Sequence, residues 1–405
     1  RLPLQKAATI AHANALRIDW QSLIDPLPFE KGSGRYDYIL GNPPFIGSKF
    51  LNEVQRFDML SLGNDIQNIG TLDYVIGWYI KAVNLINGTS TKVAFVSTNS
   101  ISQGEQVINF GSWLINQKVE IFFAHRTFQW SNEGRGVAAV HCIIIGFSCS
   151  KPLIRKIYEY KDIKGDPFIV SATNINPYLI DAPNLIAKAA SKPICKVPIL
   201  INGSIPADGG YLLLSEEDKN ILIKSEPLSA QFIRQYVGAE DFIHNLKRYC
   251  LWLVECPPNL LRQMPYVLKR IECVKNMREQ SSKLATRLKA NTPSIFTELR
   301  QPRSGNYLAI PRTSSENRSY IPIGFLDYSV IAANDLQLIC NATLFHFGVL
   351  ISQMHMVWVK LTAGRLESRL RYSAKFCYNN FPWPEHPTEK QRQAVEAAAP
   401  AVPDA

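Results

Sequence analysis

The sequence predicts an α/β protein whose first 150 residues form a mostly parallel sheet, followed by a domain of mixed α+β type. From Ala15 to Phe147, short apolar segments alternate with segments that carry apolar residues at helical spacing. The short segments are almost continuously apolar, which is typical of parallel strands covered on both faces. After residue 150 the alternation ends, and prolines, short strands and basic helices take its place.

Strands and helices can be assigned in order through the first part of the chain. Asn87-Gly88 marks the end of the first helix. Ligands of such sheets bind at the carboxyl ends of strands, which is where Asp19 and Asn42 fall. The expected strands are 15–20, 36–40, 92–97, 119–124 and 137–147, and the expected helices are 73–85 and 103–115.

The rest of the chain divides into a connector, a second domain and a tail. Prolines and small polar residues favour a connector at 151–206. We expect domains at 1–150 and 207–375, with a C-terminal return and tail at 376–405. Within the second domain we expect helices at 213–223, 228–236, 265–288 and 336–359, a strand at 247–254, and strands at 307–311 and 320–324 around a polar loop.

Composition narrows the classes of partner. The chain has 44 Lys and Arg against 34 Asp and Glu, a net charge of +10 that suits a polyanion such as nucleic acid. Its eight cysteines have no metal-ligand spacing, so we expect reduced thiols, no metal site and a cytoplasmic location. No apolar run approaches the roughly 18–20 residues that span a bilayer, so no membrane partner is expected.

The tetrapeptide Asn42-Pro43-Pro44-Phe45 follows the strand 36–40 directly. Its Asn side chain and proline carbonyls are acceptors for both hydrogens of an amino group, and the prolines fix the backbone that carries them. Phe45 offers a face on which a base flipped out of the helix can stack. This pattern predicts methylation of an exocyclic amino group; the alternative is a strand that ends in a Pro-Pro turn.

With this motif the chain resembles the class I, amino-methylating DNA methyltransferases that modify adenine, and more closely the MmeI-like restriction-modification proteins of bacteria and archaea. NPPF indicates the reaction class, and the longer segments indicate the subfamily. The resemblance is carried by ALRIDW, ILGNPPFIGSKF, FFAHRTFQWSNEGRGVAAVHCIIIGF, NINPYL, DGGYLLLS, YVGAEDFIHNLKRYCLWL, PRTSSENRSYIPIGF and YNNFPWPE, which together run from residue 15 to 385.

The resemblance implies an incomplete Rossmann-like methyltransferase sheet, an α+β target-recognition domain, S-adenosylmethionine as cofactor and double-stranded DNA as partner. Asp19 stands where the family keeps an acidic residue that binds the cofactor's adenine, although it could equally cap a turn. The family's Gly-rich cofactor turn lies upstream of NPPF, and residues 1–15 do not contain it. We therefore expect an upstream part of the same polypeptide as a further partner, and no activity from this chain alone.

Other residues near the motif have alternative interpretations. Phe128 or Trp130 would complete an aromatic sandwich around the flipped base, or both pack under their loop. Lys49 and Arg126 contact phosphate or are ordinary solvated side chains. His125 and His141 receive no role, because an uncharged amine needs no strong base before methyl transfer.

The polar loop from Arg312 to Arg318 carries side chains that read base edges in the major groove: Arg for guanine, Asn for adenine and Glu for cytosine. Glu316 and Arg318 are the preferred readers in this loop, with Arg303 just upstream. By resemblance the loop belongs to the target-recognition domain; the alternative is a plain charged hairpin.

Two further basic segments are candidates for contact with the DNA backbone. One is the Arg-rich segment 363–372, in which Arg365 and Arg369 are expected to clamp phosphates. The other is the helix 265–288, which either tracks phosphates or presents an ordinary solvated face. Its basic residues are Lys269, Arg270, Lys275, Arg278, Lys283 and Arg287.

The most consistent reading is part of an adenine-specific DNA methyltransferase, with its target-recognition domain, from a combined restriction-modification polypeptide. Two alternatives remain. One is a DNA-specificity fragment without catalysis of its own; the other is a protein glutamine methyltransferase, since that chemistry also uses an NPP-aromatic motif. The Arg-rich second half argues against a protein substrate.

Overall fold

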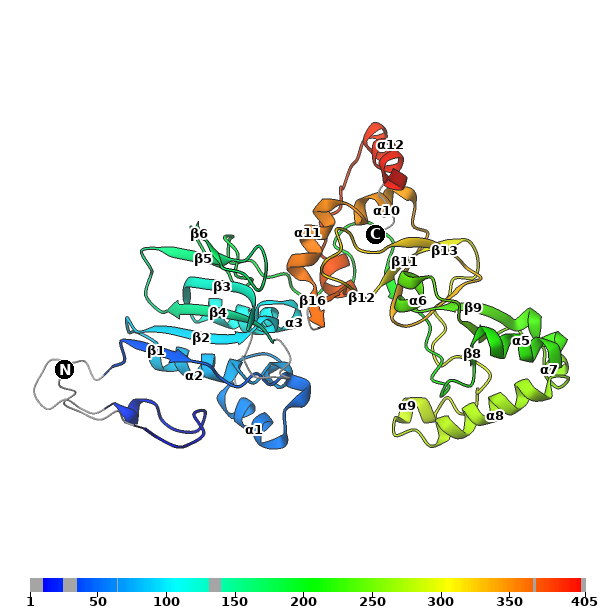
Figure 1. The fold of residues 1–405 in the computed structure, drawn as a ribbon, viewed down its shortest axis with the longest axis horizontal. Helices are drawn as coiled ribbons and strands as arrows, with labels where there is room; N and C mark the ends of the chain where they lie inside the picture. The colour runs from blue at the N-terminus through cyan, green and yellow to red at the C-terminus, as the bar shows by residue number, and fades with distance from the viewer. Residues whose placement is uncertain (1–9, 25–34, 64, 131–139, 367–368, 402–405) are drawn as a thin grey trace, which may run out of the picture. The chain divides into compact units, whose positions relative to one another are not determined.

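The computed structural model describes residues 10–24, 35–63, 65–130, 140–366 and 369–401. The chain forms two compact units, Arg1–Lys188 and Ala189–Ala405 (Figure 1). The α/β class and the sheet followed by a mixed domain are confirmed. The expected connector 151–206 contains strands of both units, β5 and β6 of the first and β7 of the second.

The first unit is built on a six-stranded sheet of order β1-β2-β4-β3-β5-β6. The pairs β1–β2 and β3–β5 are parallel, and the other three are antiparallel. The expectation of a mostly parallel sheet is therefore wrong, because β4 enters between β2 and β3 and runs opposite to both. The strands are β1 (Tyr38–Gly41), β2 (Lys92–Thr98), β3 (Glu120–Trp130), β4 (Val140–Ser148), β5 (Arg155–Glu159) and β6 (Phe168–Ala172).

Helices fill the two crossovers before β3. The first crossover holds the 3₁₀ turns η2 (Ser48–Phe50) and η3 (Ile69–Thr71) and helices α1 (Glu53–Leu62) and α2 (Ile76–Ile86). The second holds η4 (Asn99–Ser102), α3 (Gly104–Gln106), the π-turn η5 (Val107–Gly111) and α4 (Ser112–Asn116). Both helical expectations are confirmed. Helix α1 begins at a capping box in which Asn52 and Gln55 exchange hydrogen bonds.

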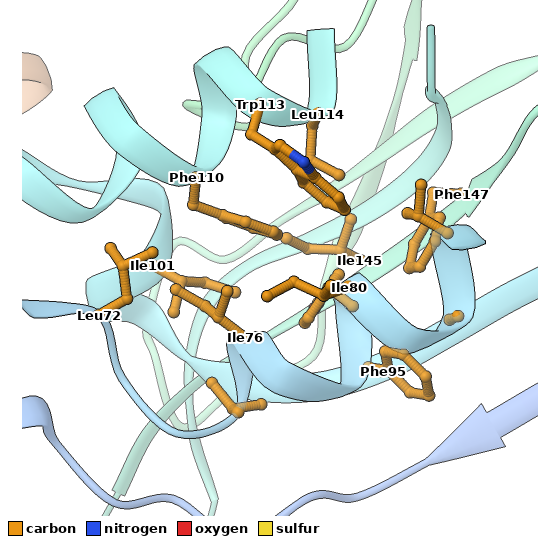
Figure 2. Packing of buried hydrophobic residues seen from close by; sticks show 14 of the residues in the cluster. Leu72, Ile76, Ile80, Phe95, Ile101, Phe110, Trp113, Leu114, Ile145 and Phe147 are labelled. Atoms are coloured by element: carbon orange, nitrogen blue, oxygen red, sulfur yellow. The ribbon is translucent and has the colours of Figure 1, made fainter. Parts of the chain in front are cut away.

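Helix α2 and the helical segment η5–α4 pack together on the sheet and form the main core of this unit (Figure 2). Ile76 and Ile80 of α2 meet Phe110 and Trp113 above Ile145 of β4. Each isoleucine is fully buried and contributes roughly 1.5–3 kcal/mol relative to an exposed one. The apolar face of α2 therefore holds this crossover helix against the sheet.

The expected strand at 15–20 is absent, and turns followed by the 3₁₀ turn η1 (Gln21–Leu23) take its place. Asn14 accepts backbone hydrogen bonds at its carbonyl from Arg17 and Ile18, and at its side chain from Leu16. Lys81 of α2 donates to the carbonyls of Leu16 and Ile18. These backbone groups are satisfied by turns and by a side chain, so no strand partner is required.

The second unit contains three small sheets. Their orders are β14-β9-β10-β8, β13-β11-β15-β7 and β12-β17-β16. The strands are β7 (Leu200–Asn202), β8 (Leu213–Leu214), β9 (Ile233–Val237), β10 (Tyr249–Leu251), β11 (Asn306–Pro311), β12 (Thr313–Ser314), β13 (Gly324–Asp327), β14 (Ile331–Ala332), β15 (Leu336–Cys340), β16 (Gly364–Leu366) and β17 (Arg369–Arg371).

Helices of this unit surround the sheets and bury three apolar clusters. They are α5 (Glu216–Ser225), α6 (Ala239–His244), α7 (Pro258–Leu261), α8 (Pro265–Glu279), α9 (Leu284–Arg287), α10 (Leu344–Leu350), α11 (Gln353–Thr362) and α12 (Glu389–Ala398), with the 3₁₀ turns η6 (Pro227–Phe232) and η8 (Ala399–Ala401) and the π-turn η7 (Ala374–Tyr378).

Several expectations for this unit are corrected by tertiary pairing. The segment 228–236 is half 3₁₀ turn and half strand β9, which pairs with β10. The single core helix expected at 336–359 is instead strand β15 followed by helices α10 and α11. The second strand of the polar hairpin starts at Gly324 rather than at 320, where it pairs with Ala309 of β11. In the part of the chain that the structure describes, no single helix meets the length and apolarity needed to span a membrane; the bent pair α10–α11 does so only jointly.

The basic helix expected at 265–288 breaks after Glu279, and one of its cations is buried. The side chain of Arg278 is 0% exposed. It donates hydrogen bonds of 2.8–3.0 Å to the carbonyls of Pro206, Ala207, Lys289, Thr292 and Ile295. Arg278 is therefore neither a solvated cation nor a phosphate ligand. Its hydrogen bonds join α8 to two loops, one at residues 206–207 and one at residues 289–295.

Replacing Arg278 with Met should destabilise the protein by about 3 kcal/mol or more, because several buried carbonyls lose their donor at once. Lys275→Met is the matched control: Lys275 is on the same helix, is half exposed, and its nearest carboxylate oxygen, on Glu279, is 3.9 Å away. We expect that control to stay within about 0.5 kcal/mol of the parent protein. Urea unfolding measures both, and equal free energies for the two variants would contradict the structural role.

Candidate functional site

The NPPF motif follows directly after strand β1, at the carboxyl end of that strand, where the crossover to β2 begins. Gly41 ends β1, and a Cβ there would lie 3.0 Å from the ring of Phe95 on β2. Asn42 is exposed, Pro43 is buried and Phe45 is half-buried. The close approach of the two strands at Gly41 thus fixes where the motif leaves the sheet.

The acceptors of the motif are not used within the fold. Among the described residues, no donor reaches the side chain of Asn42 or the carbonyls of Pro43 and Pro44. Phe45 likewise makes no ring contact with another described aromatic side chain. Asn42 is exposed, so its side-chain carbonyl is open to a ligand that brings a hydrogen-bond donor.

The segment that carries Asp19 lies beside β1 and is held by helix α2. Besides the two carbonyl bonds from Lys81, Trp20 donates through Nε1 to the carbonyl of Ala15 at 2.8 Å. The hydroxyl of Tyr36 donates to the carbonyl of Trp20 at 2.6 Å. Asp19 itself is exposed and accepts the backbone N–H of Gln21 at 3.0 Å, so it does cap a turn.

A buried carboxylate anchors the start of that segment. Asp58 of α1 accepts hydrogen bonds from Asn14 Nδ2 (3.0 Å), Arg17 Nε (2.7 Å) and the Tyr74 hydroxyl (2.9 Å). Burial raises the pKa of Asp58, but these donors lower it further, and the result lies below its ordinary value. The same contact, with burial, raises the pKa of Tyr74 to about 12.

A cavity of about 370 Å³ lies between this segment and β1. Its volume falls in the range of roughly 300–1,000 Å³ that is typical of small-molecule sites. Asp19 lies in the chain between Ile18 and Trp20, which both line the cavity, and burial together with the charge of Asp19 raises the pKa of Tyr36. The lining residues are Ala15, Ile18, Trp20, Leu23, Tyr36, Tyr38, Ile39, Leu40, Gly41, Trp78 and Phe95.

Phe128 is at the same end of the sheet as the motif but already has neighbours. It pairs with Cys142 of β4, which in turn pairs with Thr98 at the end of β2. Its ring stacks on Tyr160 at 5.4 Å and meets the edge of His125 at 6.1 Å. Trp130 ends β3 opposite Val140, but its side chain and the loop 131–139 lie outside the described residues.

Of the other candidate residues near the motif, two have partners within the protein and one is exposed. Arg126 forms an ion pair with Glu159 at 2.8 Å. His125 stacks on Tyr158 at 4.1 Å, and burial lowers its pKa. Lys49 is exposed in η2, the turn that follows the motif by three residues.

In the second unit, the three-stranded sheet β12-β17-β16 joins the polar loop to the Arg-rich segment. Thr313 pairs with Arg371 and Ser314 with Leu370; on the other side, Arg365 pairs with Leu370. Directly opposed residues point to the same face of a sheet. Leu370 is buried, so Arg365 shares its inner face while Arg369 and Arg371 occupy the outer face.

The remaining candidates of this unit lie near that small sheet in the sequence. Arg312 immediately precedes β12 and is half-buried; burial and the positive charge of Arg371 lower its pKa. Glu316 and Arg318 are half-buried in the loop, where the Arg318 N–H donates to the Ser315 carbonyl at 3.4 Å. Arg303 is exposed in the turn before β11.

The described residues contain no group of three or more His, Cys, Asp or Glu that could hold a metal ion. All eight cysteines are free.

Sequence reasoning missed the residues that hold the site in place. Asp58, Asp73 and Lys81 make their contacts to residues that are 16 to 65 positions away in the chain. The one local signal is an acidic residue flanked by apolar ones: Asp58 in the middle of α1 and Asp73 three residues before α2. Such residues are usually exposed, so their pairing could not be predicted from spacing.

Comparisons with known proteins agree across the chain. The family model described as "MmeI, DNA-methyltransferase domain" matches residues 1–159. The model described as "MmeI, target recognition domain" matches residues 181–385. DNA methyltransferase A of Bacillus subtilis is 38% identical over 397 residues, which cover 98% of this chain and 44% of that protein. A solved structure of the type IIL restriction-modification enzyme MmeI in complex with DNA is 45% identical with a TM-score of 0.87, over 99% of this chain and 53% of that one. The chain thus spans about half the length of these relatives.

Asp58→Asn should destabilise the protein in a pH-dependent way. The folded-state pKa of Asp58 is depressed, so its stabilisation is present above the unfolded value of about 3.9 and is lost as the pH falls through the folded value. Urea unfolding of parent and variant should therefore differ most at neutral pH and converge below about pH 4. A constant difference across that range would show that the carboxylate charge is not what anchors the segment.

Proposed function

Because this chain belongs to the MmeI family of restriction-modification methyltransferases, we propose that it takes part in methylating the exocyclic amino group of adenine at a specific DNA sequence. The observation that carries the proposal is the unused set of acceptors at Asn42, Pro43 and Pro44, next to the half-buried ring of Phe45. This set matches a flat base that presents two amino hydrogens.

Each member of the motif has a separate task. Phe45 stacks on the base after it has left the helix, which offsets part of the cost of unpairing it. The Asn42 side-chain carbonyl and the Pro43 carbonyl each accept one amino hydrogen, which draws electron density back toward the nitrogen. The locked φ of the prolines keeps these acceptors in place before substrate arrives, so catalysis comes mainly from positioning and preorganised dipoles.

The cavity beside β1 fits the adenosyl end of S-adenosylmethionine, which when bound supplies an activated methyl group. Trp20, Tyr36 and Trp78 give it flat aromatic walls, and Asp19 is the residue between the lining residues Ile18 and Trp20. Leu40 and Gly41 line the cavity and lead directly into Asn42, so ligands in the two sites would be neighbours. Asp19, already bonded to Gln21 through one oxygen, retains its other oxygen to accept from an adenine amino group.

An upstream part of the same polypeptide is proposed as the partner of β1. This strand is at the edge of its sheet, with Tyr38 66% and Leu40 76% exposed. Exposed apolar edge strands are liabilities unless another strand covers them. Because the cavity lies beside β1, a segment that covered this edge would also enclose the cavity. We therefore propose that this chain alone, whose cavity is open, binds the cofactor weakly and is inactive.

Double-stranded DNA is the proposed partner of the second unit. The outer face of β17 presents Arg369 and Arg371, and half-buried Arg312 immediately precedes Thr313, the residue that pairs with Arg371. Exposed arginines on neighbouring positions of one small sheet suit a polyanion such as the DNA backbone. Together with Glu316 and Arg318 in the adjoining loop, this surface combines phosphate contacts with base readers. The protein would act in the cytoplasm of a bacterial or archaeal cell.

A second candidate is a DNA-specificity module that does no chemistry. The unused acceptors of the NPPF motif favour the methyltransferase, because a module that only binds DNA has no need of them. Methylation of a protein glutamine is disfavoured by the arginine-bearing sheet of the second unit, which suits a polyanion.

Asn42→Ala in the full-length protein should abolish methyl transfer while leaving the affinity for duplex DNA nearly unchanged, because the lost carbonyl acts only on the flipped base. The measurement is incorporation of labelled methyl groups into DNA, beside a binding titration. Thr313→Ala in the second unit is the control: it should not abolish methyl transfer while leaving the affinity for duplex DNA unchanged. If Asn42→Ala methylates DNA at the parental rate, Asn42 is not the acceptor of the amino group.

Arg318→Ala should relax the preference at one base pair of the recognition sequence, at a cost of about 1–3 kcal/mol for that pair. Lys275→Ala, on the exposed face of α8, should instead weaken binding equally on all sequences and reduce the salt dependence by roughly one counterion. Sequencing of methylated sites and salt titrations separate the two effects. An Arg318→Ala protein with the parental motif at every position would remove this residue from the reader set.

A further inference from the structure

The loop that follows the NPPF motif is tied at both ends to the two residues that lead into helix α2. The carbonyl of Ile46 accepts the backbone N–H of Tyr74 at 2.9 Å. Two residues later, the backbone N–H of Ser48 donates to Asp73 Oδ1 at 3.0 Å. With planar peptides between these two points, the chain just after Phe45 has little freedom to move.

The carboxylate of Asp73 also reaches the carboxyl end of β2. The hydroxyl of Ser100 donates to Asp73 Oδ2 at 2.5 Å, and it lies 2.9 Å from the hydroxyl of Thr98, the last residue of β2. Gln106 completes the arrangement: its amide donates to Oδ1 at 3.1 Å and accepts the backbone N–H of Asp73 at 3.1 Å. One side chain thus joins the NPPF loop, the next strand end and helix α3.

Asp73 is 8% exposed, and within the described residues no Lys or Arg forms an ion pair with it. A buried carboxylate is costly unless hydrogen bonds satisfy it. Here three neutral donors, Ser48, Ser100 and Gln106, do so. Because these donors converge from three separate segments, the carboxylate sets their relative positions.

We propose that Asp73 is a positioning residue for methyl transfer, which holds the NPPF loop against the end of β2 so that the acceptors of Asn42 and Pro43 are placed for the flipped base. The inference rests on the proposed function. Strand β1 fixes the motif only on its N-terminal side, where Gly41 packs on Phe95. Asp73 and Tyr74 fix it on the C-terminal side.

The test compares Asp73→Ala with Asp73→Asn in the full-length protein. Alanine removes all three hydrogen bonds, and since a displacement of about 1 Å can cost 100-fold in rate, we expect kcat to fall about 10- to 100-fold. Asparagine keeps an oxygen for Ser48 and Gln106, and its amide can donate to the Ser100 hydroxyl. It should therefore recover most of the lost kcat.

Two further readouts separate positioning from a loss of folding. Affinity for duplex DNA should stay within about twofold of the parent, since the recognition surface belongs to the other unit. The fluorescence of 2-aminopurine at the target position, which reports the flipped base, should change in Asp73→Ala and return in Asp73→Asn. Asp65→Ala is the matched control: that carboxylate accepts from Trp113 (2.7 Å) and Gln117 (3.1 Å), makes no contact with the NPPF loop, and should alter stability alone.

If Asp73→Ala does not fold, Ser100→Ala tests the positioning role instead. This variant removes only the link between the Asp73 carboxylate and the end of β2. We expect kcat to fall severalfold, with cofactor KM and DNA affinity unchanged. An unchanged kcat in Ser100→Ala, or in a folded Asp73→Ala, overturns the inference while leaving the proposed function intact. If the parent protein itself transfers no methyl group to DNA, the proposed function fails instead.

Discussion

Burial of helix α2 is the constraint on which the candidate site depends. Its apolar face, with Ile76, Tyr79 and Ile80 fully buried, is pressed between the sheet and the helical segment η5–α4 (Figure 2). Once the helix is fixed there, its polar residues have fixed positions too. Asp73 and Tyr74, which lead into the helix, hold the loop after NPPF, and Lys81 within it holds the carbonyls of the segment that carries Asp19.

This arrangement explains how two loops with little regular structure of their own can be preorganised. Gly77 lets α2 approach its neighbours closely, since a Cβ there would lie 3.0 Å from Leu16 and 3.2 Å from the sulfur of Met59. Leu16 precedes the Asp19 turn, and Met59 is next to Asp58, whose carboxylate also binds Asn14 and Arg17. The loops near the cavity and the NPPF motif are thus held by one helix, which suits the proposed reaction, whose rate depends on the relative placement of two ligands.

In the second unit, strand pairing and burial determine which arginines are enclosed by the protein and which are exposed. Arg278 is enclosed and holds backbone carbonyls, Arg365 lies on the inner face of its small sheet, and Arg369 and Arg371 lie on the outer face. These residues have the same charge and similar sequence surroundings. Arg278 and Arg365 donate to carbonyls of the protein itself, whereas Arg369 and Arg371 are exposed on the outer face.

The sequence alone predicted the α/β class, the helices at 73–85 and 103–115 (found at 76–86 and 104–116), and the position of NPPF at a strand end, because apolar periodicity and turn residues act locally. It did not determine that β4 runs antiparallel between β2 and β3, that residues 15–20 form turns, or that Arg278 is buried. Those outcomes depend on partners far away in the chain: Lys81 lies 65 residues from Leu16, and Arg278 lies 72 residues from Pro206. Which donors and acceptors meet over such separations is decided when the elements pack, and no local pattern contains that information.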